Sequence, residues 1–253
     1  MLSVDEAILS RRSVRAFRSD PVSRETVEHI LEVASRAPSG TNTQPWRVHV
    51  LMDQALERVS GAVLKAFWEN SAAHSSDRPH YMDSWRDPYL ARRRKVGWDL
   101  YALMGIKKGE REKTQKFHSE NYRFFGAPVG LLFTIDKDMG WMSWLDYGMF
   151  IQNICIAARG QGLHTCPQAS WGHYHEILAQ ELVLEEEYSY CMMVLQVQTL
   201  LWRMSCSVEI QLARMEAGYL FTVVVLLFFL IALLVEIHRL KAVVYTHKVQ
   251  TLQ

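Results

Sequence analysis

The chain of 253 residues has only four cysteines, and no pair of them has the spacing of a CxxC motif. This scarcity favours reduced thiols in a reducing compartment over a disulfide framework or a zinc site. The ten histidines are scattered and none follows the HExxH spacing of a zinc-binding helix, so no metal site is predicted. The first residues carry no apolar signal core, and we therefore expect a cytoplasmic rather than a secreted protein.

Excess charge of either sign is also absent. The net charge is +1, which argues against a general nucleic-acid binder because such a protein needs a strong basic excess. The basic runs at 92–95 and 107–108 lie beside acids and aromatic residues and are interpreted as solvated helix faces. No GxGxxG or GxxxxGK[ST] loop occurs, so neither a Rossmann nor a P-loop nucleotide site is predicted.

The hydrophobic content of 49% is enough for a sizeable core, and its periodicity indicates an α+β domain with helices around a small mixed sheet. Expected helices follow Ser3, then cover about 23–37, 54–70, 143–160 and 174–182, with strands at 47–52 and 127–135 and a turn at 164–170. The polar stretch 71–87 is predicted to be a loop or lid. The aromatic residues after it either form a substrate wall or pack in the core.

Two helix starts carry capping boxes, Ser3 with Glu6 and Ser143 with Asp146. The helix that follows Ser143 is apolar on most of its faces, so it must be buried on most of its faces. We expect it to form either the spine of the fold or a dimer interface, with Ile151 and Ile154 at that interface.

The richest chemical signal is the pair formed by residues 11–15 (Arg-Arg-Ser-Val-Arg) and 37–46 (Ala-Pro-Ser-Gly-Thr-Asn-Thr-Gln-Pro-Trp). Three guanidiniums and a hydroxyl within five residues suit an anion, because arginine presents forked and always charged donors. The second stretch is a polar turn with proline near both ends. Together they fit a phosphorylated, hydrogen-bonding aromatic cofactor.

These two stretches resemble the amino-terminal signature of the FMN-dependent nitroreductase family, and the resemblance extends from about residue 4 to about 187. It implies a three-layer homodimeric fold with FMN at the dimer interface. In the family pattern Arg11, Ser13 and Arg15 hold the FMN phosphate, and Arg12 lies between them. The implied cofactor-binding residues are Arg11, Arg12, Ser13, Arg15, Pro38, Ser39, Gly40, Asn42, Gln44, Pro167, Gln168, Ala169 and Ser170.

The resemblance also implies how these residues are used. Pro38, Ser39 and Gly40 line the flavin from the partner subunit, and Asn42 and Gln44 hold the loop or approach the ring. The 167–170 segment presents backbone N–H groups to the flavin N5 and O4 edge. No catalytic side chain is assigned, because the flavin carries the chemistry and nothing activates Cys166.

The implied activity is an oxidoreductase that moves electrons from NAD(P)H to nitroaromatic, quinone or related small-molecule acceptors in a ping-pong cycle. The resemblance stops after about residue 187, where the composition changes. There is no glycine between Gly172 and Gly218 and no proline after Pro167. We therefore divide the chain into a domain at 1–187 and an atypical tail at 188–253 that replaces the family's last strand and phosphate-binding tail. A changed reading frame, a retained intron or an alternative terminal exon would give this pattern. The alternatives to an active enzyme are a catalytically impaired flavin binder and a membrane-tethered nitroreductase-like protein.

The tail contains the hydrophobic segment 219–235, a candidate carboxy-terminal helix. A helix of this length reaches about 24 Å, which is short of the roughly 30 Å hydrocarbon layer of a membrane. A single membrane anchor and a non-native tail both remain open from the sequence.

Overall fold

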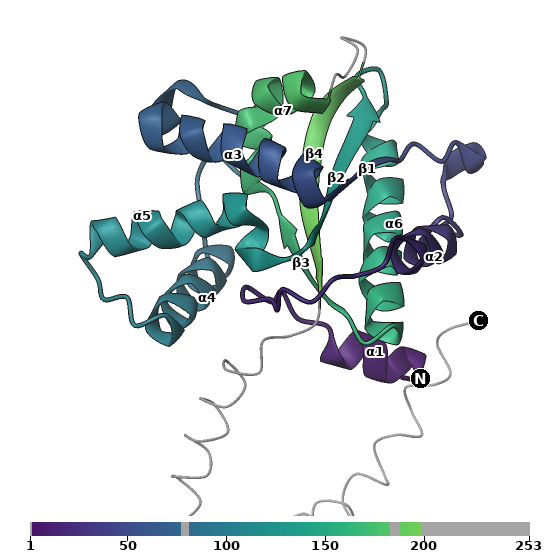
Figure 1. Ribbon diagram of the computed structural model, residues 1–253, viewed down its shortest axis with the longest axis horizontal. Helices are drawn as coiled ribbons and strands as arrows, with labels where there is room; N and C mark the ends of the chain where they lie inside the picture. The colour runs from purple at the N-terminus through teal and green to yellow at the C-terminus, as the bar shows by residue number, and fades with distance from the viewer. Residues whose placement is uncertain (1, 77–80, 183–187, 199–253) are drawn as a thin grey trace, which may run out of the picture. The chain divides into compact units, whose positions relative to one another are not determined.

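The computed structural model describes residues 2–76, 81–182 and 188–198, the last range for its backbone only (Figure 1). All of them belong to one unit that spans Met1–Leu201. The candidate span at 219–235 lies outside the described residues. Within the described ranges, no helix is long and apolar enough to cross a membrane.

The centre of the domain is a sheet of four described strands in the order β1-β2-β4-β3. The strands are β1 (Arg47–Met52), β2 (Val129–Asp136), β3 (His164–Gln168) and β4 (Tyr188–Gln198). Every pairing between them is antiparallel, so the sheet is not mixed as the sequence suggested. One isolated parallel bridge, between Ser13 and Thr165, is the exception and ties the amino-terminal segment to β3.

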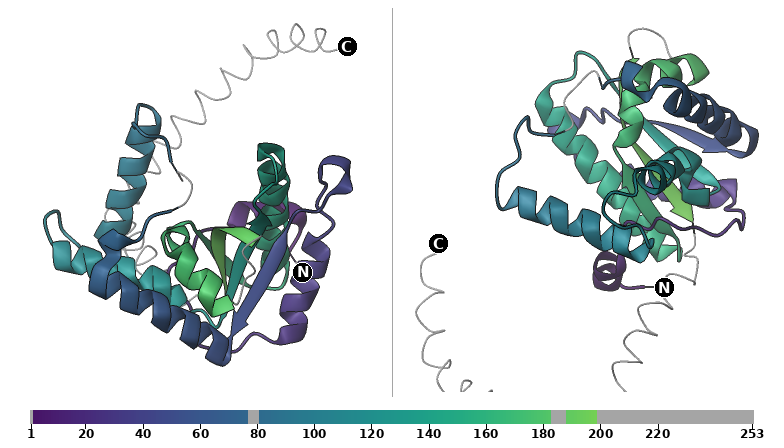
Figure 2. Two further views of the ribbon diagram at one scale, coloured as in Figure 1. Left: turned by 90° about the horizontal axis from the view of Figure 1, so that it is seen from above. Right: turned by 90° about the vertical axis from the view of Figure 1, so that its left-hand side faces the viewer.

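Helices cover both faces of this sheet, as expected for a three-layer α+β fold (Figures 1 and 2). The helices are α1 (Val4–Ser10), α2 (Arg24–Ala34), α3 (Asp53–Asn70), α4 (Tyr89–Leu103), α5 (Arg111–Ser119), α6 (Trp141–Gly160) and α7 (His175–Leu182). The core has two parts, one on each face of the sheet, and the side chains of β2 alternate between them, because successive side chains of a strand point to opposite faces. Leu131 and Phe133 pack in the core of α2 and α6, whereas Leu132 packs in the core of α3 and α7.

Strand β4 corrects the predicted domain boundary at residue 187. It begins at Tyr188 and lies between β2 and β3, hydrogen-bonded to both along its length. Residues 188–198 therefore continue the fold and join two parts of the sheet. A run of β-favouring residues can form a strand without the glycine and proline that usually mark turns. The rest of the predicted tail, from residue 199, lies outside the described residues.

The two predicted capping boxes had different outcomes. Ser3 and Glu6 form the box at the start of α1. The prediction for α6 was wrong, because this helix begins at Trp141 with Gly140 as its N-cap. Asp146 is instead buried inside the helix and its Oδ2 accepts the backbone N–H of Gly40 at 3.1 Å. This carboxylate therefore anchors the turn between α2 and β1.

Helix α6 is the spine of the domain, but the predicted interface residues face inward. Ile154 is fully buried and Ile151 is 8% exposed, and both pack in the core formed with α2 and the sheet. The exposed large apolar side chains of α6 are Trp141, Met142, Leu145 and Met149, at 74%, 52%, 55% and 40% exposure. Trp141, Leu145 and Met149 are spaced four residues apart and therefore lie on one face of the helix.

Candidate functional site

The edge strand β3 carries the amino-terminal basic segment beside it. Arg11 ends α1 in an extended conformation, which stops the helix and directs the chain along the sheet. Ser13 then forms the parallel bridge with Thr165, and the Val14 N–H donates to the Thr165 carbonyl oxygen at 3.3 Å. Residues 11–15 thus lie along β3. The predicted turn at 164–170 is instead β3 followed by a 3₁₀ helix, Ser170–Tyr174.

Arg11, Arg12 and Arg15 form a group of basic side chains that we call the arginine cluster. Among the described residues none of the three takes part in an ion pair, although other arginines of the domain do. The positive charges of Arg15 and Arg11 act on the side chain of Cys166 in β3. Burial raises the pKa of the Cys166 thiol, and the nearby Arg15 and Arg11 only partly oppose this rise. Within the described residues the cluster thus has no ion-pair partner, and an anionic group would neutralise its positive charge.

A fourth arginine, Arg159 at the end of α6, was missed by the sequence analysis. It is buried, and burial lowers the pKa of its guanidinium. Its Nε donates to Ser10 Oγ at 3.1 Å, and its Nη1 donates to the Leu163 carbonyl oxygen at 3.0 Å and lies 3.1 Å from His164 Nε2. Arg159 thus joins α1, α6 and β3, and its contact Ser10 immediately precedes residues 11–15 in the chain. The only signal for this role in the sequence is an arginine at the end of an otherwise apolar helix.

The pKa of His164 falls from 6.5 to about 4, because of burial first and then of Arg159 and Arg12. His164 is therefore neutral in the folded protein near neutral pH, and its Nε2 accepts from Arg159. The unfolded chain takes up a proton near pH 6.5 whereas the folded chain does not. The contribution of His164 to stability is thus fully present above pH 6.5 and is lost as the pH falls toward 4.

We expect His164→Gln to flatten this acid dependence, because glutamine offers Arg159 an acceptor and does not titrate. The measurement is the free energy of unfolding by urea at about pH 7 and about pH 5. The native protein should lose more stability between the two than the variant does. Equal losses would show that other groups, such as His49 and His118, whose pKa burial also lowers, account for the whole dependence.

The predicted flavin-lining residues of the 38–46 turn lie apart from the arginine cluster. The turn contains a short 3₁₀ helix, Gly40–Asn42, and extends away from the sheet between α2 and β1 (Figure 1). Pro38, Gly40, Asn42 and Gln44 are exposed and Ser39 is half-buried. The Ser39 Oγ accepts the Gln44 N–H at 3.0 Å, which closes the turn. No hydrogen bond or ion pair joins the turn to residues 11–15 in the part of the chain that the structure describes.

The 167–170 segment, in contrast, follows directly from the strand beside the arginine cluster. Gln168 is buried and its Nε2 lies 3.0 Å from Cys166 Sγ. Ala169 and Pro167 are half-buried. Among the described residues, the buried Ser170 Oγ has no hydrogen-bond partner, which is costly unless a further group supplies one. This orphaned hydroxyl fits a site that receives a polar ligand.

Aromatic residues hold the far end of this segment. The Trp171 indole N–H donates to the Asn121 carbonyl oxygen at 3.1 Å, and the Tyr122 hydroxyl lies 3.5 Å from the Ser170 carbonyl oxygen. Tyr122 packs edge-on against both Trp171 and Tyr174. Burial raises the pKa of Tyr122 far above its usual value, so its hydroxyl stays protonated and remains a donor.

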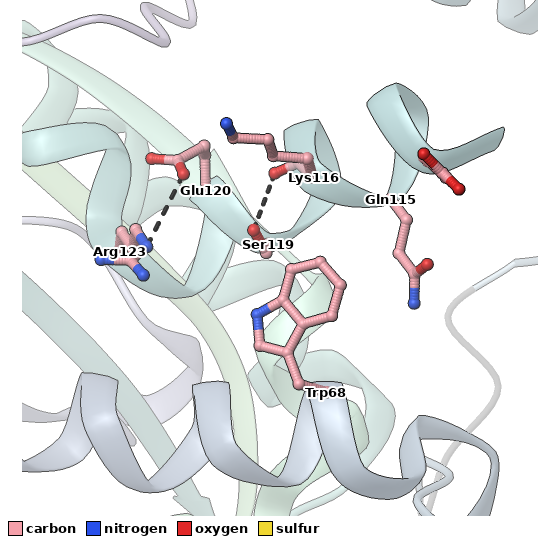
Figure 3. Close-up of a pocket in the computed structure, with 7 residues that line it drawn as sticks. Trp68, Gln115, Lys116, Ser119, Glu120 and Arg123 are labelled. Atoms are coloured by element: carbon pink, nitrogen blue, oxygen red, sulfur yellow. Dashed lines mark hydrogen bonds and ion pairs between the residues drawn. The ribbon is translucent and has the colours of Figure 1, made fainter. Parts of the chain in front are cut away.

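A separate hollow of about 570 Å³ lies between the end of α3 and α5 (Figure 3). Trp68 faces it from α3, and Lys116, Glu120 and Arg123 are among its other lining residues. Its charges are balanced, with Arg123 and Glu120 3.6 Å apart. None of the predicted cofactor-binding residues lines it.

The domain, an antiparallel sheet covered by helices on both faces with the arginine cluster beside β3, has a nitroreductase-like fold, as its alignment with solved nitroreductases shows. The chain belongs to the nitroreductase family, because the model described as "Nitroreductase family" matches residues 8–195. It is thus an enzyme of the oxidoreductase class. The match extends into β4, in agreement with the strand found there.

Individual relatives are similar over most of their length. The nitrobenzene nitroreductase of Ectopseudomonas oleovorans is 38% identical over 184 residues, which cover 73% of this chain and 81% of that protein. The crystal structure of the FMN and NADPH-dependent nitroreductase NfnB from Sphigopyxis sp. strain HMH aligns with a TM-score of 0.76 and 35% identity, covering 79% of this chain and 89% of that one. NfnB from Mycobacterium smegmatis in complex with NADPH aligns with a TM-score of 0.73 and 31% identity, covering 78% and 86%.

Proposed function

We propose that the protein is an FMN-dependent oxidoreductase that passes electrons from NAD(P)H to nitroaromatic, quinone or related acceptors. The observation that carries this proposal is the arginine cluster, which has no carboxylate partner among the described residues and is held along β3 by the bridge between Ser13 and Thr165. The relatives support the chemistry, since they are named as a nitrobenzene nitroreductase and as an FMN and NADPH-dependent nitroreductase.

The residues beside β3 fit FMN at both of its ends. Arg11, Arg15 and the Ser13 hydroxyl would hold the phosphate, because a dianion favours several forked donors. The 167–170 segment would present its backbone N–H groups and the orphaned Ser170 hydroxyl to the ring. When bound, the flavin supplies two-electron transfer in ping-pong order between NAD(P)H and the acceptor. The side chains of the site bind and orient, and need supply no acid or base.

We further infer that the active form is a homodimer. The 38–46 turn is exposed and does not reach residues 11–15 of its own chain, so it would line the flavin of the partner subunit. The exposed face of α6 formed by Trp141, Leu145 and Met149 supplies an apolar surface for that contact. Asp146, whose carboxylate holds the Gly40 N–H, lies on the same helix and would fix the turn relative to this surface.

The two cysteines whose side chains are described agree with a reducing, cytoplasmic location. Cys155 and Cys166 are both buried and free. Burial raises the pKa of each thiol, so both stay protonated and unreactive near neutral pH. The proposed reaction therefore uses no cysteine nucleophile.

A reductive titration tests the proposed function. The purified protein should show flavin absorbance, which NADPH or NADH should bleach without oxygen and which nitrobenzene should then restore. A matched sample without the nucleotide should keep its absorbance throughout. Protein that folds but has no affinity for added FMN would refute the proposal, and bound FMN that neither nucleotide reduces would leave only a flavin binder.

A further inference from the structure

Arg159, at the end of α6, is the one buried arginine among the described residues. It forms no ion pair with a described carboxylate. A buried cation is costly when it leaves water without gaining a counter-ion. Within the described residues its hydrogen-bond partners are a hydroxyl, a carbonyl oxygen and a neutral imidazole, so no negative charge offsets that of the guanidinium.

The hydrogen bonds of Arg159 join the two segments that hold the arginine cluster. Its Nε donates to the Oγ of Ser10, the last residue of α1, which directly precedes residues 11–15. Its Nη1 donates to the Leu163 carbonyl oxygen and to His164 Nε2, where β3 begins. One planar guanidinium thus links the chain that enters the arginine cluster to the strand along which the cluster lies.

The course of the chain between α1 and β3 depends on two attachment points. Ser13 is attached to β3 by its bridge, and Ser10 is attached to the same end of the strand through Arg159. Arg11 and Arg12 lie between these two points. Loss of the Arg159 contact would therefore free one end of the short segment that carries them.

Arg159 also adds a fourth positive charge to the group. Burial first, and then the charges of Arg159 and Arg12, lower the pKa of His164, so both guanidiniums lie near the same imidazole. Like charges that lie this close repel each other, and a bound anion would offset the repulsion. The charge of this region therefore favours a ligand with a phosphate over the same ligand without one.

We propose that Arg159 is a positioning residue for the FMN phosphate and sets the preference of the protein for FMN over riboflavin, which has no phosphate. This inference rests on the proposed function, because it assigns a further residue to the same site. Arg159 acts through Ser10 and the start of β3, which keep Arg11 and Arg12 in place. Its loss should therefore weaken the binding of FMN much more than that of riboflavin.

Titration of the flavin-free full chain with each flavin, followed by flavin fluorescence, tests this role. The native protein should bind FMN more tightly than riboflavin. Arg159→Gln should weaken FMN by about tenfold or more and riboflavin by less than about threefold. Arg58→Gln is the matched control and should keep the native ratio, because Arg58 likewise joins two elements, α3 and α7, through its Nε and Nη2 contacts with Glu181.

Two further variants separate positioning from folding and from charge. Ser10→Ala removes the hydroxyl that Arg159 contacts, and alanine favours a helix, so this variant should fold and weaken FMN without weakening riboflavin. It decides the question even if Arg159→Gln fails to fold. Arg159→Lys keeps the charge, but an ammonium group lacks the planar fork that reaches both Ser10 and β3, so FMN should stay weakened.

Equal weakening of FMN and riboflavin would overturn the inference, because it would show a general role in folding. Native FMN affinity in Ser10→Ala would overturn it as well, and native affinity in Arg159→Lys would show that charge alone is needed. In these cases the native protein still binds FMN, and the proposed function stands. A native protein that folds but binds neither flavin would refute the proposed function and this inference together.

Discussion

Replacing Arg11 and Arg15 together by alanine is expected to strip FMN from the protein. The two guanidiniums form no ion pair with a described carboxylate, so a phosphate bound there would receive their charge-assisted hydrogen bonds. Losing two such contacts should cost about 3–6 kcal/mol, which is roughly a hundredfold or more in affinity. The measurement is flavin absorbance of the purified variant, followed by titration with added FMN.

The control for this experiment removes the same charge elsewhere. Arg18 and Arg24 form exposed ion pairs with Asp20 and Glu28, and exposed pairs of this kind contribute little to stability. Their double alanine variant should keep its flavin. Full flavin occupancy in the Arg11 and Arg15 variant would place the phosphate site elsewhere in the chain.

Replacing Leu145 by aspartate is expected to convert the proposed dimer into monomers that bind FMN poorly. Leu145 is 55% exposed at the centre of the α6 face formed with Trp141 and Met149. An aspartate there would be buried without a partner on association, at a cost of several kcal/mol. Because the 38–46 turn of one subunit would line the flavin of the other, losing the dimer should also lose FMN. Sedimentation with flavin absorbance followed across the boundary measures both.

A second aspartate variant separates association from folding. Ile154 is fully buried in the core of the same helix, so Ile154→Asp should prevent folding rather than dissociate a folded dimer. Leu145→Asp should keep a cooperative thermal transition. A Leu145→Asp monomer that still carries stoichiometric FMN would show that each subunit holds its cofactor alone.

Local signals predicted much of the fold because they act over a few residues. The capping box at Ser3 and Glu6 and the apolar run of β2 were confirmed where the sequence placed them. The start of α6 was predicted wrongly, since Ser143 and Asp146 have the spacing of a box but a distant backbone N–H, that of Gly40, takes the carboxylate. A contact between residues 106 positions apart leaves no local pattern to detect.

The predicted end of the domain at residue 187 gave too much weight to composition, as strand β4 shows. The absence of glycine and proline suggested that the fold ended at residue 187, yet the open position between β2 and β3 is filled by 188–198. Pairing with two neighbours determines a strand more strongly than the residues that flank it.

The sequence by itself determined the family, the anion-binding character of residues 11–15 and the helical and strand periodicities, because each depends on residue types at short spacing. Only the tertiary structure decided which face of α6 is exposed, that Arg159 joins α1 to β3, and that no hydrogen bond or ion pair of the described residues links the 38–46 turn to residues 11–15. These facts depend on how distant segments pack against one sheet. Packing of that kind is set by the whole core and not by any single stretch of the chain.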